Sequence, residues 1–207
     1  MKLIGRYDSP FVRRVGVSLH VLGFPFEHAP LSPFSQASDL RQVTSIGRMP
    51  ALVLETGETL IDSAAILDYL DERVGMARAL LPASGEERRK SLRILASATA
   101  ACDKAIAINY ERRRPAEKVF ADWIARCEGQ LDAALGELEA FALTIDQSRL
   151  MQPEITTACM IGYVRRVDPQ VVRQGRYPKL DHLSSICEGS PAFLACPEQT
   201  RPSANVS

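Results

Sequence analysis

Two groups of polar atoms, at opposite ends of the stretch 46–63, could together hold a small molecule. Because Pro50 has no amide hydrogen and biases Met49 towards an extended backbone, the amide and carbonyl of Met49 are available to an extended ligand. Asp62 and Ser63 supply a carboxylate, a hydroxyl and the free amides of a helix N-terminus. This spacing indicates a site for a short, extended peptide with charged ends.

The elements that must position these atoms are an antiparallel hairpin and a helix, preceded by a strand-helix-strand unit. Ser9 and Pro10 are typical of a helix start, and Gly23 of a helix end. A strand-helix-strand unit of this length predicts parallel strands, so the first 75 residues read βαβ followed by ββα, the thioredoxin-like order. The expected strands are 2–7, 26–31, 51–55 and 58–61, and the expected helices are 10–22, 36–43 and 64–73.

The second half of the chain reads as all-helical. A stretch rich in turn residues, 77–85, predicts a linker between a domain of residues 1–76 and a second domain of residues 86–207. Pro115 and Pro178 should each start a helix. Trp123 lies in an apolar stripe that predicts a packed core, and the segment after Pro197 reads as a loose tail. The expected helices are 86–109, 115–138, 155–167, 178–188 and a last short one from 191.

Composition and charge exclude several classes of protein. The 25 basic and 25 acidic residues cancel over the 207-residue chain, which argues against a partner such as nucleic acid or an acidic membrane. All five cysteines lie beyond residue 100 without a Cys-x-x-Cys pair, which favours packed, free thiols in a cytoplasmic protein. His20, His28 and His182 are too scattered to predict a metal site.

With these pieces assembled, the chain resembles the glutathione S-transferase superfamily over nearly its whole length. The resemblance rests on three motifs in the family's order and spacing, and on the all-helical second half. Ser-Pro-Phe at the first motif is most similar to the serine-type bacterial and omega-type members. The motifs are Ser9-Pro10-Phe11, Gly47-Arg48-Met49-Pro50-Ala51-Leu52 and Ile61-Asp62-Ser63.

The resemblance implies how glutathione, the co-substrate, is held. Pro50 would be a cis proline, and the main chain of Met49 would pair with the cysteinyl backbone of glutathione. Ser63 and the helix-start amides would take the γ-glutamyl carboxylate, with Asp62 facing the ammonium group. The expected glutathione-binding residues are Phe11, Arg48, Met49, Pro50, Asp62 and Ser63.

The resemblance also places Ser9 against the glutathione sulfur as the catalytic residue. A charged hydrogen bond of about 1.5 to 3 kcal/mol and a helix dipole of about 0.3 to 1 kcal/mol would lower the thiol pKa by roughly one to two units. Two other readings stay open: Ser9 is an ordinary helix cap, or Tyr7 supplies the hydroxyl. The absence of a cysteine beside Ser9 disfavours thioltransferase chemistry.

The implied activity is transfer of glutathione to a small apolar electrophile by a homodimer. Peroxidase, isomerase or dehalogenase chemistry could use the same site, and a non-catalytic relative that binds a macromolecular partner is the alternative from another class. The arginines 112–114 lie where relatives build the electrophile pocket, but a solvated charge run is the default reading. The family's capping box in a buried helix is incomplete, because Cys159 stands where Thr156 would need an acidic partner.

Overall fold

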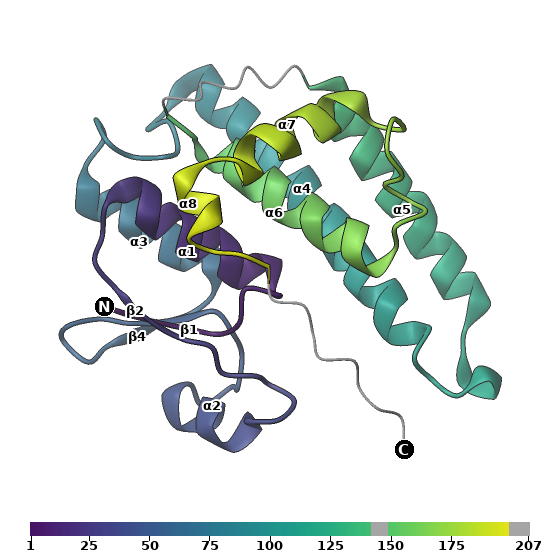
Figure 1. The fold of residues 1–207 in the computed structure, drawn as a ribbon, viewed down its shortest axis with the longest axis horizontal. Coiled ribbons are helices and arrows are strands. Elements are labelled where there is room, and N and C mark those ends of the chain that lie inside the picture. The colour runs from purple at the N-terminus through teal and green to yellow at the C-terminus, as the bar shows by residue number, and fades with distance from the viewer. Residues whose placement is uncertain (142–148, 199–207) are drawn as a thin grey trace. The chain divides into compact units, whose positions relative to one another are not determined.

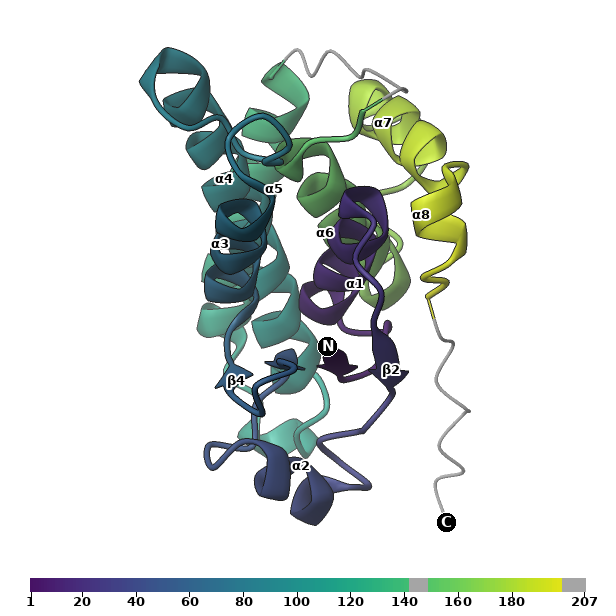
Figure 2. The ribbon, with the colours of Figure 1, turned by 90° about the vertical axis from the view of Figure 1, so that its left-hand side faces the viewer.

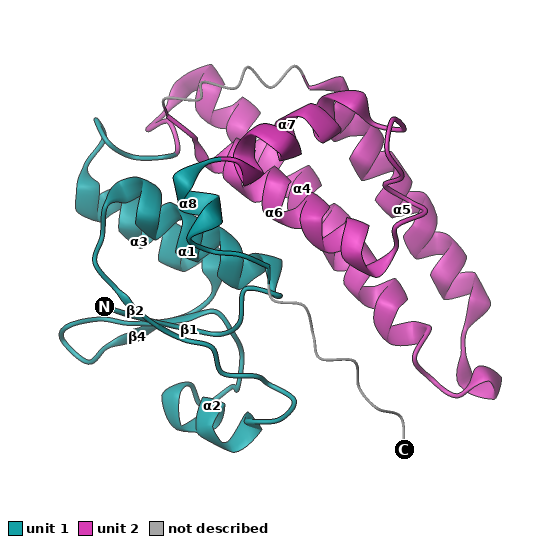
Figure 3. Cartoon of the chain, viewed as in Figure 1, with its two compact units in different colours: residues 1–80, 190–207 teal, residues 81–189 magenta. Residues whose placement is uncertain are grey.

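The computed structural model describes residues 1–141 and 149–198, which fall into two compact units (Figure 3). The first unit is Met1–Leu80 with the segment that begins at Ser190, and the second is Leu81–Gly189. The division at Leu80 lies inside the stretch 77–85 that was expected to be a linker. The segment from Ser190 groups with the first unit, whereas the sequence placed it in the second domain. Most of the expected tail, residues 199–207, lies outside the described residues.

The first unit is built on a four-stranded sheet (Figure 1). Its elements are β1 (Lys2–Ile4), α1 (Pro10–Leu22), β2 (Glu27–Ala29), α2 (Ala37–Val43), β3 (Ala51–Val53), β4 (Thr59–Leu60), α3 (Ser63–Val74) and α8 (Pro191–Leu194). The strand order is β2-β1-β3-β4. β1 is parallel to β2, with Leu3 opposite His28, and antiparallel to β3, with Leu3 opposite Leu52. The predicted thioredoxin-like order of elements is confirmed.

Both faces of the sheet are covered by helices. α1 and α3 lie on one face and α2 on the other, as the two views of Figures 1 and 2 show. On the α2 side, Leu40 packs against Ile4 and Ala51. The apolar residues of α1 that the sequence placed at helical spacing, Val12 and Val15 among them, are fully buried. This packing fixes the heads of α1 and α3 at one end of the sheet.

The strands are shorter than predicted. β1 ends at Ile4, because Gly5 adopts a φ of 124° that takes the chain out of the ladder. A side chain would not fit there, since a Cβ on Gly5 would lie 2.6 Å from Val12 Cγ2 and 3.1 Å from Met49 Sδ. The end of β1 is therefore held in close contact with both α1 and the Met49 loop.

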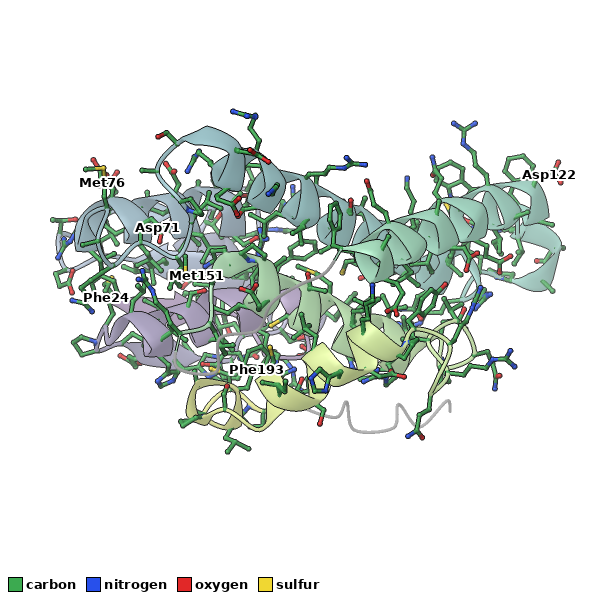
Figure 4. All side chains as sticks on the ribbon, turned by 90° about the horizontal axis from the view of Figure 1, so that it is seen from above. Phe24, Asp71, Met76, Asp122, Met151 and Phe193 are labelled. Atoms are coloured by element: carbon green, nitrogen blue, oxygen red, sulfur yellow. The ribbon has the colours of Figure 1, made fainter. Side chains whose placement is uncertain are left out.

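Arg13 attaches α8 to α1. Its guanidinium is buried, its Nε donates to the carbonyl of Cys196 at 2.8 Å, and its Nη1 lies 3.4 Å from Glu198 Oε1. The same guanidinium lies 5.1 Å from the centre of the Phe193 ring, which Figure 4 labels. Because a buried arginine must be hydrogen-bonded to be tolerated, the C-terminal segment is an integral part of the first unit.

The second unit consists of helices whose bounds agree with most of the sequence predictions. α5 begins later than expected: Pro115 leads into the short 3-10 helix η1, and the α-helix starts only at Ala121. No helix in the described ranges has the length and apolarity needed to cross a membrane. The elements are α4 (Gly85–Glu111), η1 (Ala116–Lys118), α5 (Ala121–Ala140), α6 (Gln152–Val167) and α7 (Pro178–Glu188).

The apolar stripe predicted around Trp123 is buried at Cys127, Leu131, Leu135 and Leu138, but the buried faces of α4 and α5 differ in part from the set of large apolar residues. On α4, Leu92 is exposed, and the buried residues are mostly small, including Ala98, Ala101 and Ala105. Small side chains allow neighbouring helices to approach closely, and a stripe traced through the large apolar residues misses them. On α5, Trp123 was expected in the core but is 37% exposed, with the ammonium of Lys104 5.7 Å from its ring.

The start of α6 also differs from the prediction. The helix begins at Gln152, so Thr156 lies inside it and does not cap it. The carboxylate of Glu154 instead reaches back and accepts a hydrogen bond from the amide of Met151 at 3.1 Å. Glu154 thus satisfies one of the free amides of the helix start, in the way that the acidic member of a capping box does. Burial raises the pKa of this carboxyl group.

We expect Glu154→Gln to reduce the loss of stability as the pH rises from about 4 to 7. Because the folded-state pKa of Glu154 is raised, the folded protein holds a proton that the unfolded chain releases, so the contribution of this group to stability falls across that window. Glutamine keeps an oxygen for the Met151 amide and has no proton to lose. Urea unfolding over a pH series measures the effect, with the exposed Glu117→Gln as the control. Equal pH slopes for parent and Glu154→Gln would contradict the expectation.

Candidate functional site

The Met49–Pro50 peptide bond is cis, as the sequence comparison with the family predicted. Pro50 is buried and immediately precedes β3, whose pairing with β1 ends at Ala51 opposite Ile4. Met49 therefore lies just beyond the ladder, where its main chain can pair with an extended ligand. The close contact of its side chain with Gly5 fixes its position.

Asp62 is the N-cap of α3. Its Oδ1 accepts hydrogen bonds from the amides of Ala64 at 2.9 Å and Ala65 at 3.4 Å. Both bonds use one oxygen, so the second carboxylate oxygen of this exposed residue is not needed for the cap. The Ile61–Asp62 peptide bond is also cis. The predicted helix start is confirmed, and it offers negative charge at its outer rim.

Ser63 is buried and accepts a hydrogen bond from Arg14. Nη2 of Arg14, a residue of α1 that is itself 5% exposed, lies 2.7 Å from Ser63 Oγ. The Arg14 guanidinium is also 5.7 Å from the centre of the Phe11 ring. Because arginine can only donate, Ser63 Oγ is the acceptor in this bond, and the hydroxyl proton is left to donate to an anion. The buried positive charge behind the hydroxyl favours the same anion.

Arg14 was not among the site residues predicted from the sequence. A signal was present: Arg13 and Arg14 stand in an otherwise apolar helix that has no acidic residue in its first turn. A charged residue is seldom buried unless it is paired, so two arginines on such a helix indicate specific partners. Their partners come from parts of the chain distant in sequence, which explains why spacing alone did not reveal them.

Ser9 is the N-cap of α1. The amide of Val12 donates to Ser9 Oγ over a long distance of 3.5 Å. The cap uses the oxygen as an acceptor, so the hydroxyl proton remains available to a ligand, and the residue is half-buried rather than enclosed. Ser9 therefore caps α1, and this role leaves its hydroxyl able to donate a hydrogen bond to a sulfur atom.

Tyr7, the competing hydroxyl, is enclosed by the first unit. Its ring stacks on His28 with 4.0 Å between the ring centres, and its hydroxyl is hydrogen-bonded to the Cys196 thiol. Burial and this partner raise the pKa of Tyr7 well above its usual range. Because the Tyr7 hydroxyl is buried and already hydrogen-bonded to Cys196, these surroundings do not suit Tyr7 to bind the sulfur of a ligand.

The predicted arginines differ in their surroundings. Arg48 is exposed and makes no hydrogen bond or ion pair within the described ranges. Arg112 pairs with Asp168 at 2.6 Å and Glu128 at 2.7 Å, and the hydrogen bond that Arg112 donates to Asp168 raises the pKa of Arg112 despite partial burial. Arg114 pairs with Glu111 at 3.0 Å. Arg112 and Arg114 thus take part in ion pairs of the second unit, whereas the sequence predicted a solvated charge run.

Comparison with known proteins agrees with this geometry. Residues 3–78 match the family model described as glutathione S-transferase, N-terminal domain. The uncharacterized GST-like protein YibF of Escherichia coli (strain K12) is 32% identical over 173 residues, which cover 82% of this chain and 85% of YibF. The maleylacetoacetate isomerase of Pseudomonas aeruginosa is 26% identical over 206 residues, 93% of each chain.

A solved structure extends the comparison to three dimensions. A glutathione transferase family member from Pseudomonas fluorescens Pf-5, crystallised with bound glutathione, superposes with a TM-score of 0.84 at 31% identity. The alignment covers 96% of this chain and 99% of that structure. Both the first unit and the helical second unit therefore have counterparts in it. The chain belongs to the glutathione S-transferase superfamily.

Proposed function

We propose that this protein binds glutathione in its first unit and transfers it to a small apolar electrophile. The observation that carries the proposal is the buried Arg14–Ser63 hydrogen bond at the head of α3, which prepares a hydroxyl and helix-start amides for a carboxylate. The similar Pseudomonas fluorescens structure holds glutathione, which supports the same ligand here.

Each anchor matches one part of this tripeptide. Ser63 and the α3 amides take the γ-glutamyl carboxylate, and Asp62 faces the ammonium group. The main chain of Met49, set by the cis Pro50, pairs with the cysteinyl residue. Phe11 supports Arg14 from α1, and the exposed Arg48 lies next to Met49 in the chain, where its charge can attract the ligand's free carboxylate.

Ser9 activates the sulfur in this proposal. Its hydroxyl donates to the thiolate, and the N-terminus of α1 adds a favourable dipole. From a thiol pKa near 8.5, a lowering of roughly one to two units makes the thiolate a major form at neutral pH. The thiolate then attacks the electrophilic carbon of the second substrate and forms the new carbon–sulfur bond. In a substitution, the bond from that carbon to its leaving group breaks and the leaving group departs with the electron pair. In an addition, the carbon–carbon π bond breaks and its electrons take up a proton from solvent.

A panel of electrophiles and hydroperoxides assayed with glutathione tests the reaction. The similarity to the Pseudomonas aeruginosa isomerase makes glutathione-dependent isomerisation the second candidate, so the panel includes maleylacetoacetate. Calorimetry with glutathione tests the rival reading of a non-catalytic binding protein: absence of binding at millimolar concentration would contradict the proposal. We also propose that the protein is a cytoplasmic homodimer. Gel filtration and sedimentation would measure its size.

Replacing Asp62 with asparagine should separate helix capping from ligand binding. Asparagine caps helices about as well as aspartate, so the free energy of unfolding should change by less than about 0.5 kcal/mol. Loss of the charge facing the ammonium group should weaken glutathione binding by about two- to fivefold. Calorimetry and urea unfolding measure the two effects.

The matched control is Asp62→Ala, which removes both the cap and the charge. It should lose binding to the same extent as Asp62→Asn and lose about 0.5 to 2 kcal/mol of stability in addition. Unchanged affinity in the asparagine variant would show that Asp62 is only a helix cap.

A further inference from the structure

A surface pocket of the first unit lies apart from every residue assigned above to glutathione. Its volume is about 590 Å³, within the range of about 300 to 1,000 Å³ typical of small-molecule sites. It is formed by the end of α1, the turn that follows, β2 and the residue after α8. The lining residues are Tyr7, His20, Gly23, Phe24, Pro25, Phe26, His28 and Ala195.

The walls of this pocket are aromatic rings that hold one another in place. Tyr7 and His28 are stacked at 4.0 Å with an angle of 14° between the rings. His20 and Phe26 meet edge to face, with 5.0 Å between the ring centres and an angle of 67°. Phe24, which follows α1 and is labelled in Figure 4, completes the set. Paired rings lose little freedom when a flat ligand binds, so these walls are preorganised for an aromatic molecule.

The polar atoms of the lining are mainly acceptors. His28 Nε2 lies 2.7 Å from the carbonyl of Gly5, which can only accept, so Nε2 carries a hydrogen and Nδ1 is the nitrogen of this ring that can accept a hydrogen bond. Partial burial lowers the pKa of His20, which disfavours the charged imidazolium and favours the form with one acceptor nitrogen. The Tyr7 hydroxyl is engaged by Cys196. No lysine, arginine or carboxylate is among the lining residues.

We propose that this pocket is a second binding site, for a planar aromatic molecule that carries a phenolic hydroxyl. The rings of Phe24, Phe26 and His28 take its flat faces, and an imidazole nitrogen of His20 or His28 accepts the hydrogen bond from the hydroxyl. An aromatic carboxylate should bind more weakly, because no lysine or arginine is among the lining residues to pair with its charge.

Fluorescence titration of the full chain with 2-naphthol tests this site, with S-hexylglutathione present to occupy the proposed catalytic site. 2-Naphthol should bind in the presence of that competitor. 2-Methoxynaphthalene cannot donate a hydrogen bond and should bind about five- to tenfold more weakly. 2-Naphthoate should bind more weakly than 2-naphthol at neutral pH.

Variants locate the binding to the pocket. His20→Phe and His28→Phe each keep an aromatic ring, and at least one of them should weaken 2-naphthol binding several-fold while leaving 2-methoxynaphthalene unchanged. His28→Phe is a second variant, with thermal unfolding as a check because it loses the bond to Gly5. His182→Phe, on α7 of the second unit, is the matched control and should change neither ligand.

Several results would overturn the proposal. Displacement of 2-naphthol by S-hexylglutathione would place it in the catalytic site instead. Undiminished binding of 2-naphthol to both His20→Phe and His28→Phe would place it elsewhere on the molecule. Binding of 2-naphthoate as tight as that of 2-naphthol would contradict the role of the two acceptor nitrogens, and absence of 2-naphthol binding at millimolar concentration would remove the site.

Discussion

Replacing Ser9 with alanine should raise the pKa of protein-bound glutathione by about one to two units, since each unit corresponds to 1.36 kcal/mol and a charged hydrogen bond contributes about 1.5 to 3. The helix cap uses the oxygen of Ser9 and not its hydroxyl proton. Loss of that proton should therefore mainly affect the hydrogen bond to the ligand's sulfur. Ultraviolet titration of the bound thiolate measures the shift.

The rate should follow the thiolate fraction. Below both pKa values, kcat/KM of Ser9→Ala should be about ten- to hundredfold lower than that of the parent, and the two should converge as the pH rises above about 9. Ser9→Thr keeps the hydroxyl and should retain most of the activity. Tyr7→Phe should leave the thiol pKa unchanged, because the Tyr7 hydroxyl faces Cys196. An unaltered thiol titration in Ser9→Ala would remove Ser9 from the mechanism.

The second large effect is expected at Ser63. Ser63→Ala removes the hydroxyl proposed to donate to the γ-glutamyl carboxylate, and glutathione affinity should fall by about ten- to hundredfold, which is the worth of one charged hydrogen bond. Calorimetry measures the dissociation constant. Thermal unfolding is measured alongside, because the buried Arg14 loses its partner at 2.7 Å.

A double-mutant cycle distinguishes binding from folding. Arg14→Met should also weaken glutathione, and the double variant with Ser63→Ala should lose less than the sum of the two single losses, because Arg14 acts on the carboxylate in part through Ser63. The comparison ligand is a glutathione analogue that lacks the γ-glutamyl carboxylate. Both single variants should bind this analogue as the parent does. Equal losses for glutathione and the analogue would mean that the pair serves only the fold.

The sequence predicted the order of elements in the first unit because its signals are local. Ser9 with Pro10, Gly23, and Asp62 each mark a helix end through their own backbone and side-chain preferences, and the structure has helix ends at all three. The cis bond before Pro50 was predicted from the family resemblance alone, since local preferences favour trans. Roles assigned to Ser9 and the glutathione-binding residues stay predictions.

The features that sequence reasoning missed depend on partners distant in the chain. Arg14 donates a hydrogen bond to Ser63, and Arg13 donates one to the carbonyl of Cys196. β1 ends early at Gly5, where Val12 and Met49 leave no room for a side chain. The buried face of α4 consists mostly of small residues, which allow neighbouring helices to pack closely. Periodicity and propensity describe one segment at a time, so contacts between segments lie beyond them.

The attachment of α8 to α1 has a consequence for how the protein is made. The first unit is completed only by residues near the end of the chain, since Arg13 finds the Cys196 carbonyl and the Phe193 ring there. Chains emerge from the ribosome N-terminus first. Arg13 can therefore form its hydrogen bond to the Cys196 carbonyl only after the helical unit has been synthesised. A truncated product ending before Ser190 would carry an uncovered guanidinium and an open apolar face on α1.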